Sequence, residues 1–343
     1  MTGDAPACPV CLVAGARFYA AGEDRLFRRA AGHYLLYQCR SCLCVFQHPF
    51  PDREAIAGFY PENYWRSAEP PFGKRTARWL KQMERRYREF VAADHVRFLQ
   101  RCARSRGGRE QRVLDIGCGS GLFLHLARRR GFICHGMDAS AQAVRLVREQ
   151  YGLDVRQGAV GEDIWGGLRF DFVTLFHVLE HLTDPRAAVA YAAAHLKPGG
   201  SLILQVPNLG SLQARCFGRR WYGLDVPRHI INFTPAGFRL LLKATGFQIQ
   251  RAAFFSLRDN PASIASSLAP GLDPISRAGR TAQSRALPSA LKDFVYFGLV
   301  LACAPMALME GILGRGGTIW VQARPVDAQT IHGREWRQDE KRA

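Results

Sequence analysis

The feature that most constrains the fold is the segment VLDIGCGSG at residues 113–121, which leads directly into an apolar, helix-like stretch. A buried strand that turns through glycines into a helix opens many nucleotide-binding α/β folds. The glycines let the backbone approach a ligand closely, and the amino end of the helix offers unpaired N–H donors. The spacing is G-x-G-x-G, which differs from the G-x-G-x-x-G of dinucleotide-binding proteins. A nicotinamide dinucleotide is therefore the less favoured ligand.

An acidic residue ends the next strand of the pattern. Residues 131–137 are strand-like, and Asp138 follows them. In nucleotide-binding folds, an acid about twenty residues beyond the glycine turn accepts hydrogen bonds from ribose hydroxyls. The glycine turn and this acid together predict a bound nucleoside.

Strands and helices continue to alternate after Asp138. This alternation predicts a parallel, doubly wound α/β sheet. Ligands bind at the carboxyl ends of the strands in such sheets, so the residues that follow each strand are the candidates for chemistry. We expect strands at residues 154–157, 170–176, 201–206, 247–256 and 317–324, and helices at 187–196 and 235–245.

Four ordered motifs resemble those of class I S-adenosylmethionine-dependent methyltransferases. They are VLDIGCGSG at 113–121, GMD at 136–138, FHVLEHLTDP at 176–185 and LKPGGSLILQVPN at 196–208. The resemblance implies a seven-stranded Rossmann-like sheet in the order 3-2-1-4-5-7-6, with the last strand antiparallel. It implies S-adenosylmethionine as the cofactor, with Asp138 on the ribose and the segment at Ala159 beside the adenine. The implied cofactor-binding residues are Asp115, Gly117, Cys118, Gly119, Gly121, Asp138, Ala159, Phe176 and His177.

Two C-x-x-C pairs near the amino terminus, Cys8/Cys11 and Cys39/Cys42, have the spacing of a zinc site. Two such turns place four thiolates around one ion, and a site closed in this way stabilises a fold without taking part in catalysis. A redox pair or free thiols are the alternatives, but a redox C-x-x-C opens a helix, and neither pair has that context. We expect a structural zinc ribbon at residues 1–50. The ribbon and the later FYPENYW motif resemble a bacterial subgroup that includes sugar methyltransferases and proteins of surface-polysaccharide synthesis.

The remaining chain divides into three further parts. Residues 51–108 form a proline-punctuated linker and an amphipathic helix, residues 109–326 form the methyltransferase domain, and residues 327–343 form a polar tail. The domain carries a hydrophobic helical insert at about 257–316, with a charge-free run at residues 294–309. That run is shorter than the roughly 20 residues that a membrane-spanning helix needs. A single crossing would also place the last β-strand on the opposite side of the membrane from the rest of its sheet. We expect a buried or interfacial helix, and membrane-surface association through residues 294–313 is the less favoured alternative.

The net positive charge favours anionic binding partners but does not indicate which kind. There are 47 Lys and Arg against 29 Asp and Glu, a net charge of +18, and the excess is concentrated at residues 72–130. A basic stretch attracts nucleic acid, an anionic membrane surface or a phosphorylated substrate, although a solvated helix face has the same composition. The amino-terminal residues lack the pattern of a secretory signal, so we expect reduced cysteines and a cytoplasmic protein, at most peripheral to the inner membrane face.

Two clusters follow the fourth and fifth strands. His177, Glu180 and His181 form the first, and they either catalyse or merely support the cofactor and the next helix. The second is WYGLDVPRH at 221–229, which resembles the E-H-x-x-x-F-S segment of sugar C-methyltransferases, in which the His is the base. Arg228 stands where those enzymes have Glu, and an arginine there is suited to grip a phosphate or carboxylate. We expect His229 as the general base, with Tyr222, Asp225 and Arg228 in the same acceptor pocket.

These features favour one function over two others. The leading hypothesis is S-adenosylmethionine-dependent methyl transfer to a small molecule, a sugar or a glycan precursor. An RNA methyltransferase with a zinc module is the first alternative, because the basic region suits nucleic acid. A zinc-ribbon binding protein with a degenerate methyltransferase fold is the second, although the intact glycine turn and Asp138 argue against it.

Overall fold

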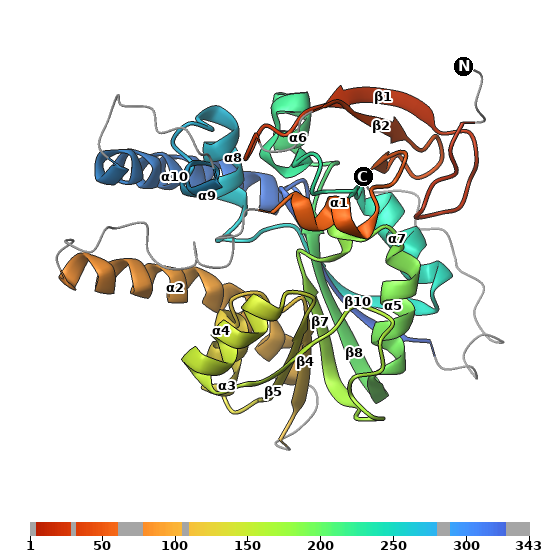
Figure 1. Ribbon diagram of the computed structural model, residues 1–343, viewed down its shortest axis with the longest axis vertical. Helices are drawn as coiled ribbons and strands as arrows, with labels where there is room; N and C mark the ends of the chain where they lie inside the picture. Colours follow the sequence, from red (N-terminus) through yellow and green to blue (C-terminus); the bar gives the residue numbers. More distant parts are fainter. Residues whose placement is uncertain (1–4, 29–31, 61–77, 105–109, 280–288, 327–343) are drawn as a thin grey trace.

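The structure is a computed structural model that describes residues 5–28, 32–60, 78–104, 110–279 and 289–326. Figure 1 shows a central sheet flanked by helices on both sides, with a smaller sheet above its upper edge. The expected polar tail at 327–343 and the residues of FYPENYW beyond Tyr60 lie outside the described residues.

The central sheet has the order β6-β5-β4-β7-β8-β11-β10. Neighbouring strands from β6 to β8 pair in parallel, whereas β11 pairs antiparallel with both β8 and β10. The mixed seven-stranded α/β sheet that the sequence predicts is therefore confirmed. The strands are β4 (Arg112–Ile116), β5 (Ile133–Asp138), β6 (Asp154–Gln157), β7 (Phe170–Phe176), β8 (Leu196–Pro207), β10 (Phe247–Ala253) and β11 (Thr318–Pro325).

Helices cover both faces of this sheet, which explains why most residues of its central strands are buried and apolar. On one face, α2 (Arg78–Ala103), α3 (Leu122–Arg128) and α4 (Ala141–Tyr151) pack against residues such as Phe172 and Trp320. On the other, α5 (Pro185–Ala194) and α7 (Pro235–Ala244) pack against Leu175 and its neighbours. Helix α5 starts two residues earlier than expected, because Asp184 caps it by accepting a hydrogen bond from the Ala187 N–H at 2.9 Å.

The smaller sheet joins the amino-terminal segment to the domain. Its order is β1-β2-β3-β9, with β1 (Arg17–Gly22), β2 (Tyr34–Gln38) and β3 (Val45–Gln47) from the amino-terminal segment. The fourth strand, β9 (Ile231–Asn232), comes from the long connection after β8 and pairs antiparallel with β3. The expected boundary at residue 50 therefore does not separate two sheets. The physical reason is that so short a ribbon leaves an open edge, which β9 covers.

The expected insert is helical. It contains α8 (Asn260–Leu268), α9 (Pro274–Gly279) and α10 (Ser289–Ile312), and α10 packs against α8. Figure 1 shows these helices together on one side of the molecule. The shorter elements are α1 (Arg53–Gly58), α6 (Leu212–Phe217) and the 3₁₀ turns η3 (Leu179–His181), η4 (Gly218–Arg220) and η5 (Tyr222–Leu224).

Candidate active site

The turn after β4 needs glycine for two reasons. Gly117, Gly119 and Gly121 all have positive φ angles, of 73°, 52° and 68°. A Cβ atom at Gly117 would lie 2.5 Å from Val178, and one at Gly121 would lie 2.6 Å from Val147. The turn is therefore both left-handed and tightly packed against η3 and α4, so neither Gly117 nor Gly121 can be replaced by a residue with a side chain without strain.

Asp138 holds this turn from the end of β5. Its two carboxylate oxygens accept hydrogen bonds from the backbone N–H groups of Gly119 and Ser140, each at 2.9 Å. Burial raises the pKa of Asp138, and these two donors oppose that rise. Each oxygen keeps a further acceptor site, so the carboxylate has the capacity to bind ribose hydroxyls where the sequence predicts. The glycine turn and Asp138 together thus fit a nucleoside cofactor.

Four other predicted cofactor residues lie around the turn. Burial raises the pKa of Asp115 to about 7, and its carboxylate accepts a hydrogen bond from the Thr174 hydroxyl at 2.6 Å. The backbone N–H of Cys118 donates to Met137 O at 3.0 Å, and the Phe176 ring packs 4.4 Å from the His95 ring. The Ala159 N–H donates to Glu162 at 3.1 Å. In this structure these groups brace the turn and the adjacent loops.

His177, the next predicted cofactor residue, is an ion-pair partner. Its Nδ1 lies 3.0 Å from Glu180 Oε1, and its Nε2 lies 3.4 Å from Asp259 Oδ2 at the start of α8. Burial alone would lower the pKa of His177, but the two carboxylates outweigh it and raise the pKa to about 9. The imidazole is therefore protonated at neutral pH and is unsuited to act as a base.

The two clusters identified in the sequence meet in space. The His181 and His229 rings are 4.8 Å apart, and their Nδ1 atoms lie 2.9 Å from Arg228 O and 2.7 Å from Gly223 O. A carbonyl oxygen only accepts, so each Nδ1 carries a proton and each Nε2 is the basic nitrogen. Burial and the neighbouring His229 lower the pKa of His181 to about 4, so this ring is neutral.

Glu180 completes this cluster. One ligand atom from each of Glu180, His181 and His229 lies within 4.8 Å of the other two. Burial alone would raise the pKa of Glu180, but its contact with His177 lowers it overall, so the carboxylate is charged. Its Oε2 is buried and has no hydrogen-bond partner among the described residues. A buried acceptor without a partner is costly and is commonly satisfied by a ligand.

Sequence reasoning missed two contributors to this site. Tyr60, from the linker, places its hydroxyl 3.2 Å from His181 Nδ1. Asp259, from the insert, also accepts a hydrogen bond from Gln205 Nε2 at 2.7 Å. The only sequence signal was the aromatic FYPENYW motif for Tyr60, and Asp259 had none, because its role depends on how the insert folds back.

Arg228 lies elsewhere than we expected. Its side chain is 2% exposed, and it donates to Asp24 Oδ1 and to Asp225 Oδ2, each at 2.9 Å. Burial alone would lower the pKa of Arg228, but the two carboxylates raise it overall. The guanidinium also stacks over Phe27, 4.4 Å from the ring centroid. Arg228 and Asp225 therefore tie the loop to the segment after β1. Asp24, Asp225 and the Phe59 carbonyl take four of the five N–H donors of this buried guanidinium.

We expect Arg228→Met to destabilise the protein by about 3–5 kcal/mol, because it takes the guanidinium away from the buried Asp24 carboxylate. Urea unfolding measures the loss. The double variant Asp24→Asn/Arg228→Met is the control, and it should recover part of the stability because position 24 no longer buries a charge, although Asp225 still lacks the guanidinium. If Arg228→Met keeps its stability but has a raised KM for the acceptor, Arg228 binds the acceptor as the sequence predicted.

Tyr222 and Asp225 line a cavity on the other side of this loop. The cavity has a volume of about 470 Å³ and lies between the β1–β2 hairpin, the η4–η5 loop and the insert. Its walls include Arg25, Arg219 and Arg220, and Arg25 donates to Arg219 O at 2.6 Å. His229 faces Glu180 and His181, so the four predicted catalytic residues do not share one pocket.

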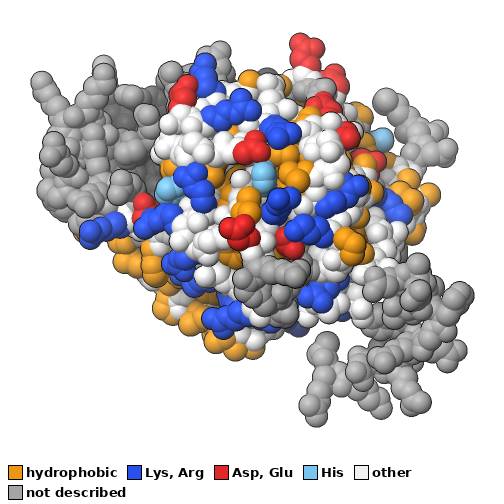
Figure 2. All heavy atoms as spheres, turned by 90° about the horizontal axis from the view of Figure 1, so that it is seen from below, with side chains coloured by type: hydrophobic (Ala, Val, Ile, Leu, Met, Phe, Trp, Pro, Cys, Tyr) orange, Lys and Arg blue, Asp and Glu red, His pale blue; other side chains and the backbone are white. Residues whose placement is uncertain are grey.

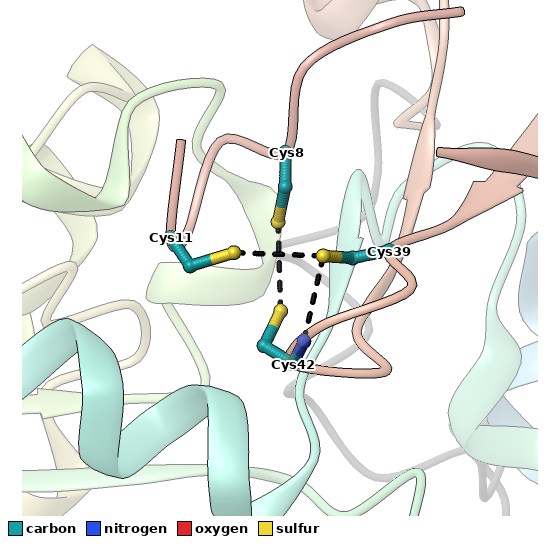
Figure 3. Close-up of side chains that lie close together, drawn as sticks. All are labelled: Cys8, Cys11, Cys39 and Cys42. Atoms are coloured by element: carbon teal, nitrogen blue, oxygen red, sulfur yellow. Dashed lines mark hydrogen bonds between the residues drawn. The ribbon is translucent and has the colours of Figure 1, made fainter. Parts of the chain in front are cut away.

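The four predicted metal ligands converge (Figure 3). Cys8 Sγ lies 3.5 Å from Cys42 Sγ, Cys11 Sγ lies 3.5 Å from Cys39 Sγ, and all four sulfurs are within 4.8 Å of one another. Tetrahedral zinc with Zn–S bonds of about 2.3 Å separates its sulfurs by about 3.8 Å. Contact with Cys42 and burial raise the pKa of Cys8, so a cation would be needed to hold these thiols as thiolates. The donor set and its spacing fit zinc.

The fold and the site together define a class I S-adenosylmethionine-dependent methyltransferase. A glycine turn and a buried acid, Asp138, stand at the carboxyl edge of a seven-stranded mixed sheet, and polar groups follow the next two strands. The family described as "Methyltransferase domain" matches residues 80–252, and the chain belongs to it.

Several characterised proteins are similar to this chain. The ubiquinone biosynthesis O-methyltransferase of Coxiella burnetii is 31% identical over 130 residues, which cover 36% of this chain and 53% of that protein. The enzyme of the same name from Erwinia tasmaniensis is 30% identical over 175 residues, which cover 48% and 71%. The chain thus spans about half the length of the first of these relatives. Magnesium protoporphyrin IX methyltransferase from Synechocystis, solved with bound SAH, is 18% identical with a TM-score of 0.46, covering 60% of this chain and 94% of that one.

Proposed function

We propose that the protein transfers a methyl group from S-adenosylmethionine to a hydroxyl oxygen of a small anionic acceptor. The observation that carries this proposal is the pair of imidazoles, His181 and His229, whose Nδ1 protons are held by carbonyl groups beside the charged Glu180. In this arrangement Nε2 is free to accept a proton from the acceptor hydroxyl. The names of the relatives, which are O-methyltransferases, support oxygen as the methylated atom.

The chain's own residues have two tasks in such a reaction. The sulfonium of the cofactor is already activated, so catalysis consists of aligning the acceptor and removing its proton. His229 takes the hydroxyl proton at Nε2 as the oxygen–methyl bond forms, and Glu180 stabilises the resulting imidazolium. The products are the methyl ether and the thioether of the cofactor, with the proton passing from His229 to solvent.

The arginine-lined cavity favours an acceptor that carries phosphate. Arg25, Arg219 and Arg220 line part of it, beside Glu23 and Asp225, and guanidinium groups bind phosphate through paired hydrogen bonds. Because the cavity lies on the other side of the loop from His229, the acceptor would have to place its phosphate there and its hydroxyl at His229. A phosphorylated sugar or glycan precursor has this chemistry and agrees with the subgroup that the sequence resembles. The face seen in Figure 2 does not favour RNA, because its Lys and Arg side chains are scattered among acidic and apolar ones and do not form a stripe.

We also propose that Cys8, Cys11, Cys39 and Cys42 hold one structural zinc ion in a reducing, cytoplasmic setting. Helix α7 begins beside these cysteines, where the Thr234 hydroxyl donates to Cys42 O at 2.6 Å. Gly237, in the first turn of α7, has no room for a Cβ atom, because that atom would lie 2.1 Å from Cys44 Sγ. The zinc site would thereby fix the segment that follows His229 in the chain.

We expect His229→Ala to slow turnover by about 10²–10⁴-fold, the usual contribution of a general base, while leaving cofactor affinity unchanged. Steady-state kinetics with a phosphorylated glycan precursor and calorimetry with S-adenosylhomocysteine measure the two quantities. His135→Ala is the matched control, since His135 pairs with Asp154 near the opposite edge of the sheet. Normal turnover by His229→Ala would make His229 structural, and loss of cofactor binding would place it on the wrong side of the site.

Further experiments distinguish a phosphorylated acceptor from RNA and a general base from a metal site. Inorganic phosphate should compete with the acceptor, and Arg220→Ala should weaken that competition, if the arginine-lined cavity binds phosphate. Co-purified RNA that salt releases steeply would favour the RNA methyltransferase instead. Turnover lost in chelator and restored by a divalent cation would mean that Glu180, His181 and His229 hold a metal rather than a proton.

A further inference from the structure

Helix α10 is apolar on the side that faces the protein and on the side that faces away. Val300, Cys303 and Ala307 are buried against Ile264 and Ala265 of α8. The opposite side is exposed along its whole length, from Phe294, 75% exposed, to Ile312, 77% exposed. A helix that is apolar all round belongs either in a protein core or in contact with lipid. The exposed apolar residues are Leu291, Phe294, Val295, Phe297, Leu301, Met306, Leu308, Met309, Ile312 and Leu313.

The two carboxylates of α10 are withdrawn from this outer side. Asp293 forms an ion pair with Arg277 of α9. Glu310 is 3% exposed and accepts a hydrogen bond from Gln213 Nε2 at 3.0 Å. The exposed side therefore presents no carboxylate that would repel anionic lipid.

The apolar surface extends beyond α10. Leu268, at the end of α8, and Ile275, in α9, are also exposed on this helical insert. Among the described residues, the segment Leu291–Ile312 is long and apolar enough to cross a membrane by length and composition, with a mean hydropathy of 1.8 and 22% of it buried. Exposed apolar residues in this number on one helix mark a binding face.

The fold prevents α10 from crossing a bilayer. Its carboxyl end leads within a few residues to β11, which pairs with β8 in the central sheet. Gln213 joins Glu310 of α10 to the Trp221 indole, which donates to Gln213 Oε1 at 3.1 Å. Both the last turn of α10 and the strand after it are thus fixed to the body of the protein, so the helix has to lie along a surface.

We propose that α10 docks the protein on the surface of an anionic lipid bilayer, with its exposed apolar side at the level of the acyl chains. This is the binding mode of interfacial helices, whose affinity scales with buried apolar area and with attraction to anionic lipid. The net charge of +18 complements such a surface. A protein partner is less suited, because protein interfaces carry a polar rim, and the outer side of α10 offers few polar groups. The inference is independent of the proposed acceptor.

Co-sedimentation with vesicles of phosphatidylcholine and phosphatidylglycerol tests the proposal. We expect the full chain to bind, and Leu301→Glu/Met309→Glu to weaken the partition by about 100-fold or more, because two side chains lose their apolar burial. Phe18→Glu is the matched control, since Phe18 on β1 is 59% exposed but lies in the amino-terminal sheet, and it should bind like the wild type. Affinity for S-adenosylhomocysteine should stay unchanged in all variants and reports that they are folded.

Three results would overturn the proposal. They are no binding of the wild type, equal binding by the α10 variant, and a weakening by Phe18→Glu as large as that of the α10 variant. Dimerisation of the wild type in sedimentation velocity that the α10 substitutions abolish, without vesicle binding, would assign the face to a second copy. If the glutamate variant does not fold, Phe294→Ser/Ile312→Ser removes exposed apolar groups at both ends of the helix and should weaken binding in the same direction.

Discussion

Replacing Asp138 with alanine should weaken the binding of S-adenosylhomocysteine by about 10²–10⁴-fold. Two ribose hydroxyls would lose a charged acceptor, and each such hydrogen bond contributes about 1.5–3 kcal/mol. The same carboxylate also holds the N–H groups of Gly119 and Ser140, so its loss loosens the glycine turn as well. Isothermal titration calorimetry measures the affinity directly.

Two comparisons make the result specific. Asp154→Ala removes a carboxylate at the start of the neighbouring strand, where it pairs with His135 and Arg156, and it should bind the cofactor normally. Asp138→Asn keeps an acceptor oxygen but removes the charge, so its affinity should fall between the wild type and the alanine variant. Undiminished affinity in Asp138→Ala would contradict the cofactor site as we describe it.

Removing the proposed zinc ion should have the largest effect on stability. Structural zinc sites contribute about 10–16 kcal/mol of apparent binding free energy at neutral pH, which appears as folding free energy when the site forms only in the native state. Here the cysteines pack in the same apolar cluster as Phe233 and Phe238, which flank the start of α7. We therefore expect chelation, or Cys39→Ser, to lower the melting temperature of the whole chain and not only of its amino-terminal segment.

Metal analysis and thermal unfolding test this expectation together. The purified protein should hold one zinc per chain, and Cys39→Ser should hold almost none. Cys216→Ser is the control, because Cys216 is exposed on α6 and remote in sequence from the four ligands. Metal-free protein with an unchanged melting temperature would refute a structural zinc site, since a ligand that binds only the native state must stabilise it.

The sequence predicted the central sheet well because its signals are local. The strands at residues 154–157 and 170–176 have the expected bounds, and the glycine turn has the left-handed conformations that its spacing implies. The boundary at α5 was less accurate, because Asp184 and Pro185 favour an earlier start than apolar periodicity alone indicates. The helical insert was also foreseen, since a charge-free run of this length is visible without any tertiary information.

The site could be predicted only in part. The sequence identified His177, Glu180 and His181 as one cluster and His229 as another, but it gave no means to see that they adjoin. It also assigned Arg228 to an acceptor, because nothing in the sequence shows that Asp24, some two hundred residues earlier, neutralises it in the folded chain. Tyr60 and Asp259 reach the site from a linker and an insert, which no motif connects to it.

There is a physical reason why some features follow from the sequence and others only from the tertiary structure. Backbone conformation, apolar periodicity and metal-ligand spacing depend on neighbours a few residues apart, so the sequence alone determined the α/β class, the cofactor turn, the acid at Asp138 and the grouping of four cysteines. Burial, ion pairing and the tautomer of a histidine depend on groups that only the packed chain brings together. The tertiary structure therefore decided that β9 closes the amino-terminal sheet, that Arg228 is a buried ion-pair partner, and that His181 and His229 face Glu180.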